Sequence, residues 1–323
     1  MLVQDTQTGL VFNAAFDPQL LAYDADYQNE QACSAVFQRH LDEVAGLIDR
    51  HLAGRALIEV GCGKGYFLEH LRARGYAITG LDPAYEGSNP DVIKAPFEAG
   101  LGLSADGIVM RHVLEHMQAP MDFLSDIARA NRNQGIAYIE VPCLDWICTH
   151  RAWFDLFYEH VNYFRLRDFH RMFGRVLDSG HVFGGQYLYA FVDLATLRTP
   201  EAGNDDLVCL PADFMAGVDQ ARARVLQSPR RNVIWGAASK GVIFATHLMR
   251  QGVRFDLAID INPAKQGRFL PVSGLRVASP EEAATLLEPG DHMFVMNSNY
   301  LQEIIEQSGN RFTYITVDHE KIL

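Results

Sequence analysis

Apolar runs alternate with amphipathic stretches along much of the chain, and residues 56–84 give the first example. The run Ala56–Val60 is apolar apart from Glu59 and leads into a turn that contains three glycines. A helical pattern covers Tyr66–Arg74, and a second apolar run, Ala77–Leu81, ends at Asp82. A strand, a glycine-rich loop, a helix, a second strand and an acid in this order predict one βαβ unit.

The same order of elements recurs in the second half of the chain, over Asn232–Gly267. Here the loop is GAASKG, and Asp260 follows the second strand. Two strand-like runs on either side of Gly184 and Gly185 predict an antiparallel hairpin that closes a sheet. The remaining pattern predicts strands in Gly107–Met117, which runs on into a loop, in Gly135–Pro142, near Asp291–Met296 and near Phe312–Val317, with helices in Ala119–Asn131 and near Leu301–Gln307.

A polar segment with proline and glycine, Leu197–Asn204, separates the two α/β regions. A helical pattern from about Pro211 to Leu226 follows it. We therefore expect an N-terminal arm (residues 1–30), a first domain (31–197), a linker with a helix (198–228) and a second, smaller domain (229–323). The predicted fold class is α/β, with a mixed, mostly parallel sheet in the first domain.

Composition narrows the classes of protein and partner. A chain of 323 residues with 48% apolar and 21% charged residues suits two globular domains. No apolar run approaches the roughly 20 residues that span a bilayer, and the N-terminus lacks a signal peptide, so we expect a cytoplasmic protein without a membrane partner. The net charge of −12 argues against duplex nucleic acid as a partner. The five cysteines are scattered without a CxxC pair, which predicts reduced thiols.

The glycine loop EVGCGKG, Glu59–Gly65, lies between a predicted strand and a predicted helix. Glycine lets the backbone turn tightly and lets a ligand approach main-chain amides. Asp82, about 20 residues further on, suits hydrogen bonds to ribose hydroxyls. The GxGxG spacing differs from that of dinucleotide-binding loops, and Lys64 is followed by glycine, which excludes a Walker A loop.

Three motifs in this order, Glu59–Gly65, Gly80–Pro83 and Arg111–His116, resemble those of class I S-adenosylmethionine-dependent methyltransferases. The resemblance implies a Rossmann-like fold with a seven-stranded sheet, S-adenosyl-L-methionine as the cofactor and S-adenosyl-L-homocysteine as its product. In that family an N-terminal arm often covers the cofactor, so Tyr23 and Tyr27 are candidates for a lid, or else simple anchors of the arm. The implied cofactor contacts are Glu59, Gly61, Cys62, Gly63 and Gly65 in the loop, Asp82 and Pro83 at the ribose, Ala95 and Phe97 near adenine, and Arg111, His112 and Val113 beside the sulfonium.

A second resemblance concerns the C-terminal half. Trp235–Gly241, Asp260–Val277 and Asn297–Ile304 are similar to the C-terminal domain of NDP-sugar C-methyltransferases, which place a methyl on a ring carbon of a nucleotide-linked deoxy-ketosugar. The resemblance implies a second, smaller Rossmann-like domain. Members of that family usually begin with a cysteine-rich zinc module, and Thr8 stands where a cysteine is expected. We therefore predict no metal.

The run Tyr158–Phe164 stands where that family has its Glu-His motif, although the usual Tyr-His-Glu-His is Phe157-Tyr158-Glu159-His160 here. Methyl transfer to carbon needs a base that removes a proton next to a carbonyl, and His is suited to that role near neutral pH. The candidate catalytic residues are the base His160, the carboxylate Glu159 that orients it, the donor Tyr158 and the rival base His112. Structural roles for His160, Glu115 and His116 stay open, and the phenylalanines Phe154, Phe157, Phe164, Phe169 and Phe173 are expected in the core.

A helix N-terminus after GAASKG, with lysines nearby, suits a phosphate. Exposed lysines and a tight packing turn would give the same pattern. The candidate substrate-binding residues are Tyr163, Gly236, Ser239, Lys240, Lys265, Arg268 and Asn299.

Three functions remain open on these residues. The first is C-methylation of a nucleotide-linked keto-sugar through an enolate. The second is O- or N-methylation of another small metabolite, and the third is a catalytically inactive nucleotide-sugar-binding homologue. The partner is in each case a small molecule, and we expect a monomer or a weak homodimer.

Overall fold

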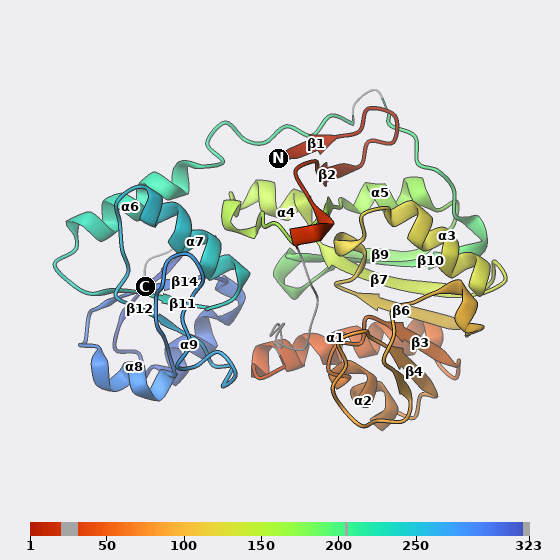
Figure 1. The fold of residues 1–323 in the computed structure, drawn as a ribbon, viewed down its shortest axis with the longest axis horizontal. Helices are drawn as coiled ribbons and strands as arrows, with labels where there is room; N and C mark the ends of the chain where they lie inside the picture. Colours follow the sequence, from red (N-terminus) through yellow and green to blue (C-terminus); the bar gives the residue numbers. More distant parts are fainter. Residues whose placement is uncertain (21–31, 204–205, 319–323) are drawn as a thin grey trace. The chain divides into compact units, whose positions relative to one another are not determined.

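A computed structural model of the chain describes residues 1–20, 32–203 and 206–318 (Figure 1). It forms two compact units, each assembled from separate parts of the chain. The first unit comprises the described residues of 1–27, 39–145 and 158–209, and the second those of 28–38, 146–157 and 210–323. Residues 146–157 therefore group with the second unit, although they lie inside the span predicted for the first domain. None of the helices in the described residues has both the length and the apolar character that a membrane span requires.

The first unit contains a seven-stranded sheet with the order β5-β4-β3-β6-β7-β10-β9. The strands from β5 to β7 are parallel, and β10 is antiparallel to both β7 and β9. This confirms the predicted mixed, mostly parallel sheet and its closing hairpin. The strands are β3 (Leu57–Val60), β4 (Ile78–Leu81), β5 (Val92–Ile93), β6 (Gly107–Arg111), β7 (Ile136–Pro142), β9 (Val176–Val182) and β10 (Tyr187–Asp193).

Helices cover both faces of this sheet, which is why its central strands are almost continuously apolar. In Figure 1, α1 and α2 lie below the strands and α3 and α5 lie above them. Their bounds are α1 (Ala35–Leu52), α2 (Tyr66–Ala73), α3 (Pro120–Ala130) and α5 (Leu166–Met172). A further helix, α4 (Leu144–Thr149), lies mostly in residues 146–157, which group with the second unit. The turn between β9 and β10 places Gly184 and Gly185 at φ 65° and 85°, conformations in which glycine is favoured.

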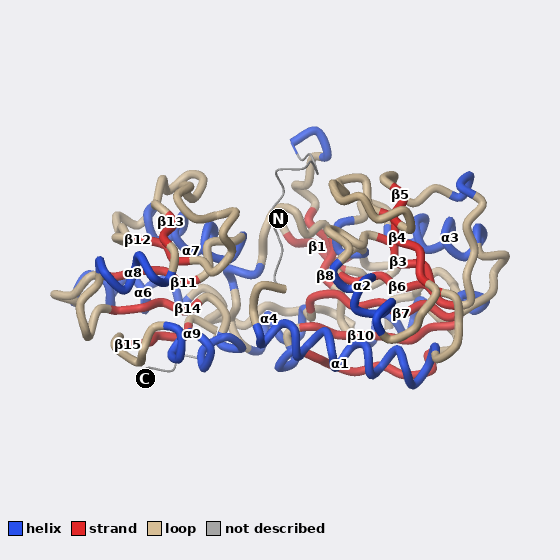
Figure 2. Tube along the Cα trace, turned by 90° about the horizontal axis from the view of Figure 1, so that it is seen from below, coloured by secondary structure: helices blue, strands red, loops and turns tan. Residues whose placement is uncertain are grey.

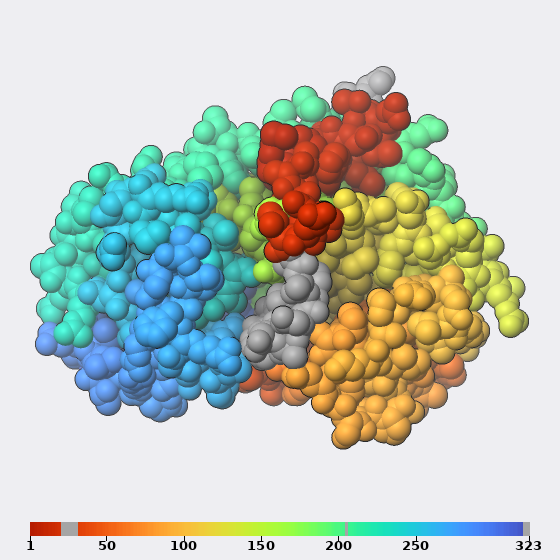
Figure 3. Space-filling view, viewed as in Figure 1, coloured from red at the N-terminus to blue at the C-terminus, as the bar shows by residue number. Residues whose placement is uncertain are grey.

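A small antiparallel sheet carries the predicted catalytic segment. Its strands are β1 (Leu2–Gln4), β2 (Val11–Asn13) and β8 (Asn162–Tyr163), in that order. The register pairs Val11 with Tyr163 and Phe12 with Asn162. The N-terminal residues, red in Figure 3, form part of the molecular surface. Because β2 pairs with β8, main-chain hydrogen bonds connect the N-terminal residues to the segment that contains His160.

The second unit is built around a parallel five-stranded sheet with the order β13-β12-β11-β14-β15. Helices lie on both of its sides, with α6 and α7 above the strands and α8 and α9 below them in Figure 1, while Figure 2 shows the strands spread out side by side. The apolar side chains of the strands form its core, with Val233, Ile259, Met293 and Tyr314 almost fully buried. The elements are β11 (Asn232–Trp235), β12 (Leu257–Ile259), β13 (Val277–Ala278), β14 (His292–Val295), β15 (Thr313–Thr316), α6 (Ala216–Gln227), α7 (Ser239–Arg250), α8 (Pro280–Leu286) and α9 (Leu301–Gln307).

Three expectations differ from the structure. The helix predicted from about Pro211 begins at Ala216, because a turn closed by the Phe214 amide and the Pro211 carbonyl precedes it. The segment predicted as a linker hydrogen bonds within the first unit, where the Arg198 amide donates to the Met172 carbonyl. Phe157 is only half-buried, whereas the other four predicted core phenylalanines of its region are at most 1% exposed.

Candidate active site

The glycine loop between β3 and α2 adopts left-handed backbone conformations. Gly61, Gly63 and Gly65 have φ values of 72°, 55° and 79°, which side chains rarely adopt. A Cβ atom at Gly61 would lie 2.4 Å from Cγ2 of Val113, so a side chain there would displace that residue. At Gly63 no heavy atom of the described residues lies within 4 Å of the Cβ position. The loop is therefore closely packed at its start and open at its middle glycine.

Asp82 holds this loop in shape from the end of β4. Its Oδ2 accepts a hydrogen bond from the Gly63 amide at 2.8 Å, and its Oδ1 accepts one from the Ala84 amide at 2.8 Å. The amides of Gly61 and Cys62 donate to the Leu81 carbonyl. The acid thus fixes the middle glycine of the loop, and a contact from Asp82 to a ribose stays a prediction.

The predicted cofactor residues of the described chain gather at one edge of the seven-stranded sheet. They follow the carboxyl ends of the parallel neighbours β3, β4, β5 and β6, where ligands of open α/β sheets bind. The edge carries the glycine loop after β3, Asp82 and Pro83 after β4, Ala95 and Phe97 after β5, and Arg111, His112 and Val113 at and after the end of β6. Tyr23 and Tyr27 lie outside the described residues.

Glu59 is a buried carboxyl group at the start of the loop. Glu59 is only 2% exposed, and its Oε2 makes no hydrogen bond within the described residues. Burial raises the pKa of Glu59 to about 7, although Arg111 opposes this shift. The site therefore contains a buried acid with an unused acceptor atom.

A second buried carboxylate, Glu140 on β7, lies at the centre of a charged network. Its Oε1 is 3.1 Å from His40 Nε2, 3.2 Å from Arg111 Nη2 and 3.2 Å from His112 Nε2. The Tyr138 hydroxyl donates to its Oε2 at 2.6 Å. Burial alone would raise the pKa of Glu140, but Arg111 and the two histidines hold it well below the usual range. The register of β6 and β7, which pairs Arg111 with Glu140, creates this contact.

His112 follows β6 with φ 54°, an uncommon value for a residue other than glycine. This conformation places its ring between two buried carboxylates, with Nδ1 3.3 Å from Glu115 Oε1 and Nε2 3.2 Å from Glu140 Oε1. Burial lowers the pKa of His112, but the two carboxylates outweigh burial and raise it to about 9. The two carboxylates therefore favour the imidazolium form of His112.

The segment with the predicted base lies on the small antiparallel sheet. His160 is 7% exposed and Tyr163 is 4% exposed, with their ring centroids 6.1 Å apart. The hydroxyl of Tyr158 accepts a hydrogen bond from the Asp17 amide at 2.7 Å, and its ring packs on Phe16. The structure thus directs Tyr158 toward the N-terminal segment.

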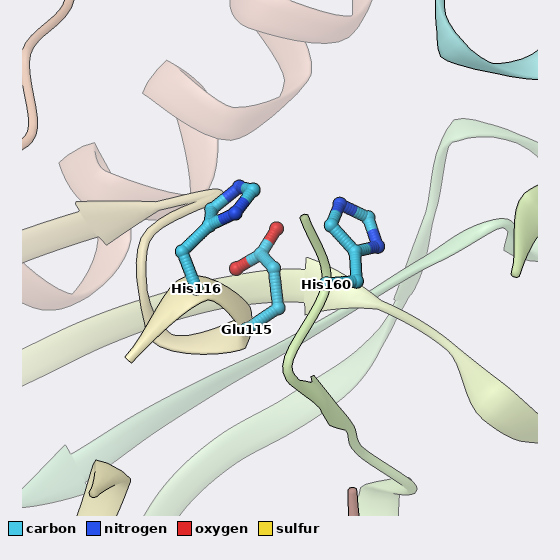
Figure 4. A group of neighbouring side chains, drawn as sticks. All are labelled: Glu115, His116 and His160. Carbon is cyan, nitrogen blue, oxygen red and sulfur yellow. The ribbon is translucent and has the colours of Figure 1, made fainter. Parts of the chain in front are cut away.

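Glu115 and His116 approach His160 from the short 3-10 helix Leu114–His116, which follows β6 (Figure 4). One potential ligand atom from each of the three residues lies within 4.8 Å of the other two. The rings of His116 and His160 are 5.0 Å apart and meet at 75°. His116 Nδ1 donates to the Glu159 carbonyl at 2.8 Å. The structure therefore places Glu115 and His116 beside the predicted base.

Comparisons with known proteins agree with this arrangement. Residues 27–176 match the model of a family described as methyltransferase domain, and residues 212–313 match the C-methyltransferase C-terminal domain. The chain is also 26% identical to the C-methyltransferase NovU of Streptomyces niveus over 84% of its own length and 73% of the relative's. The protein is an S-adenosylmethionine-dependent methyltransferase.

Other similarities of this methyltransferase are more local or more distant. It is 32% identical to a tRNA U34 carboxymethyltransferase of Pseudoalteromonas translucida, over 29% of this chain and 34% of that one. A structure of the 1,6-didemethyltoxoflavin-N1-methyltransferase of Burkholderia thailandensis, with bound 1,6-didemethyltoxoflavin and S-adenosylhomocysteine, covers 57% of this chain and 94% of its own at 16% identity and a TM-score of 0.37. A structure of the PH0226 protein of Pyrococcus horikoshii covers 53% of this chain and 99% of its own, at 12% identity and a TM-score of 0.41.

The residues at the sheet edge fit the cofactor of a methyltransferase. Its methionyl part carries a cationic ammonium group, and Glu59 offers a buried carboxyl group with an acceptor atom that forms no other described hydrogen bond. The open side of Gly63 allows a ligand to approach the backbone. When bound, S-adenosylmethionine supplies an electrophilic methyl group on a positively charged sulfur.

Glu59 predicts a pH-dependent stability of the cofactor-free methyltransferase. The pKa of its carboxyl group is 4.5 in the unfolded chain and about 7 in the folded protein. Between these two pH values the folded protein therefore binds more protons than the unfolded chain. Stability is therefore lost as the pH rises from the lower value to the higher, by about 3 kcal/mol in total. Glu59→Gln has no carboxyl group to ionise and should not show this loss. The free energy of unfolding of the variant, relative to that of the wild type, should therefore be higher at about pH 8 than at about pH 5. Urea unfolding at both pH values measures the difference, and a difference independent of pH would contradict the assignment.

The loop of the second unit repeats the hydrogen bonding of the first. Asp260 accepts from the Ala237 amide at 2.9 Å and from the Asn262 amide at 2.8 Å, as Asp82 does from Gly63 and Ala84. Gly236 has φ 118°, and a Cβ atom at Gly241 would lie 2.0 Å from the Gly236 carbonyl oxygen. Both units thus contain a glycine turn whose shape is fixed by the acid after the second strand.

The predicted cations of the second unit are largely compensated by carboxylates. Lys240 Nζ lies 2.7 Å from Oδ2 of Asp155, a residue that is 2% exposed. Lys265 Nζ lies 3.5 Å from Asp260 Oδ2. Arg268 is exposed. The Asn299 amide donates to the Asn297 side chain, and Ser239 begins α7.

The sequence interpretation missed Glu140, His40 and Tyr138. One signal was available, because Glu140 is the single charged residue in the apolar run Gly135–Pro142. A buried acid in such a strand needs partners. The histidine among those partners, His40, lies 100 residues away in sequence, and no local pattern identifies it.

Proposed function

We propose that this methyltransferase transfers its methyl group to a carbon atom next to a carbonyl of a nucleotide-linked keto-sugar. The observation that carries the proposal is the match of residues 212–313 to the C-terminal domain of C-methyltransferases. The similarity to a C-methyltransferase over 84% of the chain supports a carbon acceptor. Carbon next to a carbonyl becomes a nucleophile only when a base removes its proton, so the proposal requires a base.

His160 is the base in this proposal. Both ring nitrogens of the rival, His112, lie within 3.3 Å of buried carboxylate oxygens. This geometry favours the imidazolium form, which has no lone pair to accept a proton. His112 then acts as a fixed positive charge at the end of β6. His160 accepts the proton, with the carboxylate of Glu115 close enough to favour the imidazolium that forms.

Tyr163 is the proposed donor to the enolate oxygen. Its buried ring lies next to that of His160, and a phenol hydroxyl stabilises a developing oxyanion when it is preorganised. Tyr158 has a different proposed role, because its hydroxyl is bound by the Asp17 amide. It holds the N-terminal segment against the segment that carries His160.

The second unit is the proposed site of the nucleotide. Its loop offers main-chain amides at the start of α7, and the acid Asp260 fixes the loop as Asp82 fixes the first one. Because Lys240 and Lys265 are paired with Asp155 and Asp260, a phosphate would depend mainly on the amides that follow Ala237 at the start of α7 and on exposed Arg268.

Calorimetry with the enzyme saturated by S-adenosylhomocysteine tests the acceptor class. We expect a nucleoside diphosphate sugar to bind, and Arg268→Ala to weaken it about tenfold, the value of one charge-assisted contact. Arg222→Ala, an exposed arginine on α6, is the matched control and should leave the affinity unchanged. Cofactor binding without any nucleotide-sugar binding would overturn the acceptor class, and a methyl group found on oxygen or nitrogen by NMR of the product would overturn the carbon acceptor.

A further inference from the structure

Three side chains with metal-ligating atoms converge in the first unit, and we refer to Glu115, His116 and His160 as the His-Glu cluster. Figure 4 shows the Glu115 carboxylate between the two imidazole rings. One ligand atom of each residue lies within 4.8 Å of the other two, a spacing that a single ion with bonds of about 2.0–2.2 Å can close by small rotamer changes. The cluster combines two imidazoles with one carboxylate.

Glu115 gives an independent sign that this cluster accepts a cation. The residue is 1% exposed, and neither carboxylate oxygen makes a hydrogen bond of acceptable geometry within the described residues. Its Oε1 is 3.3 Å from His112 Nδ1. A buried carboxylate with so little hydrogen bonding is costly. Since a carboxylate has about four lone-pair sites, Glu115 can keep its contact to His112 and also bind an ion.

The tautomer of His116 supports the same conclusion. Its Nδ1 donates a hydrogen bond to the Glu159 carbonyl at 2.8 Å, so in the neutral ring Nε2 is the nitrogen that carries the lone pair. Histidines that bind metals in proteins are held by this kind of hydrogen bond from their other nitrogen. Glu159 and His160 are adjacent in sequence, so the same segment orients one ligand and provides another.

We propose that the His-Glu cluster binds a divalent transition-metal ion of the Zn²⁺ type and that this ion inhibits methyl transfer. Two imidazoles and a carboxylate suit zinc, cobalt, nickel and iron, whereas Mg²⁺ and Ca²⁺ prefer oxygen ligands throughout. Three protein ligands leave a fourth position for water. The inhibition rests on the proposed function, because an ion on His160 takes the lone pair that the base requires. The binding does not rest on it.

Titration of metal-stripped, full-length protein with Co²⁺ tests the binding, since tetrahedral cobalt has visible absorption bands. We expect one Co²⁺ per chain, displaced by Zn²⁺. Glu115→Gln and His116→Asn should each weaken the affinity by at least about tenfold. Asparagine retains a donor toward the Glu159 carbonyl, and circular dichroism checks that both variants are folded.

His170→Asn is the matched control, because His170 is an exposed histidine on α5 that contacts Ser179. Equal cobalt affinity in the wild type, Glu115→Gln and His116→Asn would overturn the site, as would an absence of cobalt bands in the wild type. With a methyl acceptor in hand, Zn²⁺ should inhibit turnover and a chelator should restore it. Stimulation by Zn²⁺ would overturn the inhibitory role. The cobalt titration measures metal binding independently, even for a protein that shows no methyl transfer.

Discussion

His160→Gln is expected to lower the turnover of this methyltransferase by about 10²–10⁴-fold, the usual contribution of a general base. Glutamine keeps much of the buried volume of His160 but cannot accept a proton at neutral pH. The affinity for S-adenosylmethionine should stay nearly unchanged, because the predicted cofactor residues lie at or just after the ends of β3, β4, β5 and β6, whereas His160 lies just before β8. Steady-state kinetics and calorimetry on the same preparation measure the two effects.

A second readout separates a base from a structural histidine. With S-adenosylhomocysteine bound, the wild-type enzyme should exchange the acceptor proton next to the carbonyl for solvent deuterium, and His160→Gln should not. His170→Gln serves as the control, because His170 is an exposed histidine of the same unit. Unimpaired turnover and exchange in His160→Gln would make His160 structural and would reopen the assignment of the base.

Glu140→Leu is expected to destabilise the protein by about 3–5 kcal/mol, the cost of removing one partner from a buried ion pair. The carboxylate is fully buried and neutralises Arg111 and His112, while Tyr138 and His40 complete its contacts. Leucine would leave Arg111 and His112 without this charge, although the Arg111 side chain is only 9% exposed. Urea unfolding of the cofactor-free protein at neutral pH measures the loss.

Two controls define that result. Glu288→Gln removes an exposed carboxylate, 76% accessible and 3.8 Å from Arg230, and should change the stability by less than about 0.5 kcal/mol. Glu140→Gln retains an acceptor for Tyr138 and Arg111, so its loss of stability should lie between those of Glu288→Gln and Glu140→Leu. A loss in Glu140→Leu no larger than that in Glu288→Gln would mean that the network does not stabilise the fold.

The glycine loops could be predicted from sequence because their signals are local. Glycines that need positive φ and an acid at the end of the next strand lie within about 25 residues of one another in each unit, and the structure shows Asp82 and Asp260 bonded to their loops. The alternating apolar runs likewise predicted the mixed, mostly parallel sheet of the first unit and the βαβ order of the second. These features depend on chain neighbours and on the periodicity of strands and helices.

The charged contacts could not be predicted, since they depend on register and on long-range packing. Arg111 meets Glu140 only because β6 and β7 pair at that residue. Lys240 contacts Asp155, which lies 85 residues away in sequence. Because this carboxylate compensates its charge, Lys240 is less available to bind a phosphate. The same holds for Glu115, whose position beside His160 depends on a short 3-10 helix after β6.

The discontinuous course of the chain determines how this protein can be divided for experiments. A fragment that begins at Leu210 would lack residues 146–157, which belong to the second compact unit. It would lose the stacking of Trp153 on Phe244 and the carboxylate of Asp155 beside Lys240. An isolated second unit therefore needs residues 146–157 supplied by circular permutation or as a separate peptide, and a simple cut between the halves would expose an apolar face of α7.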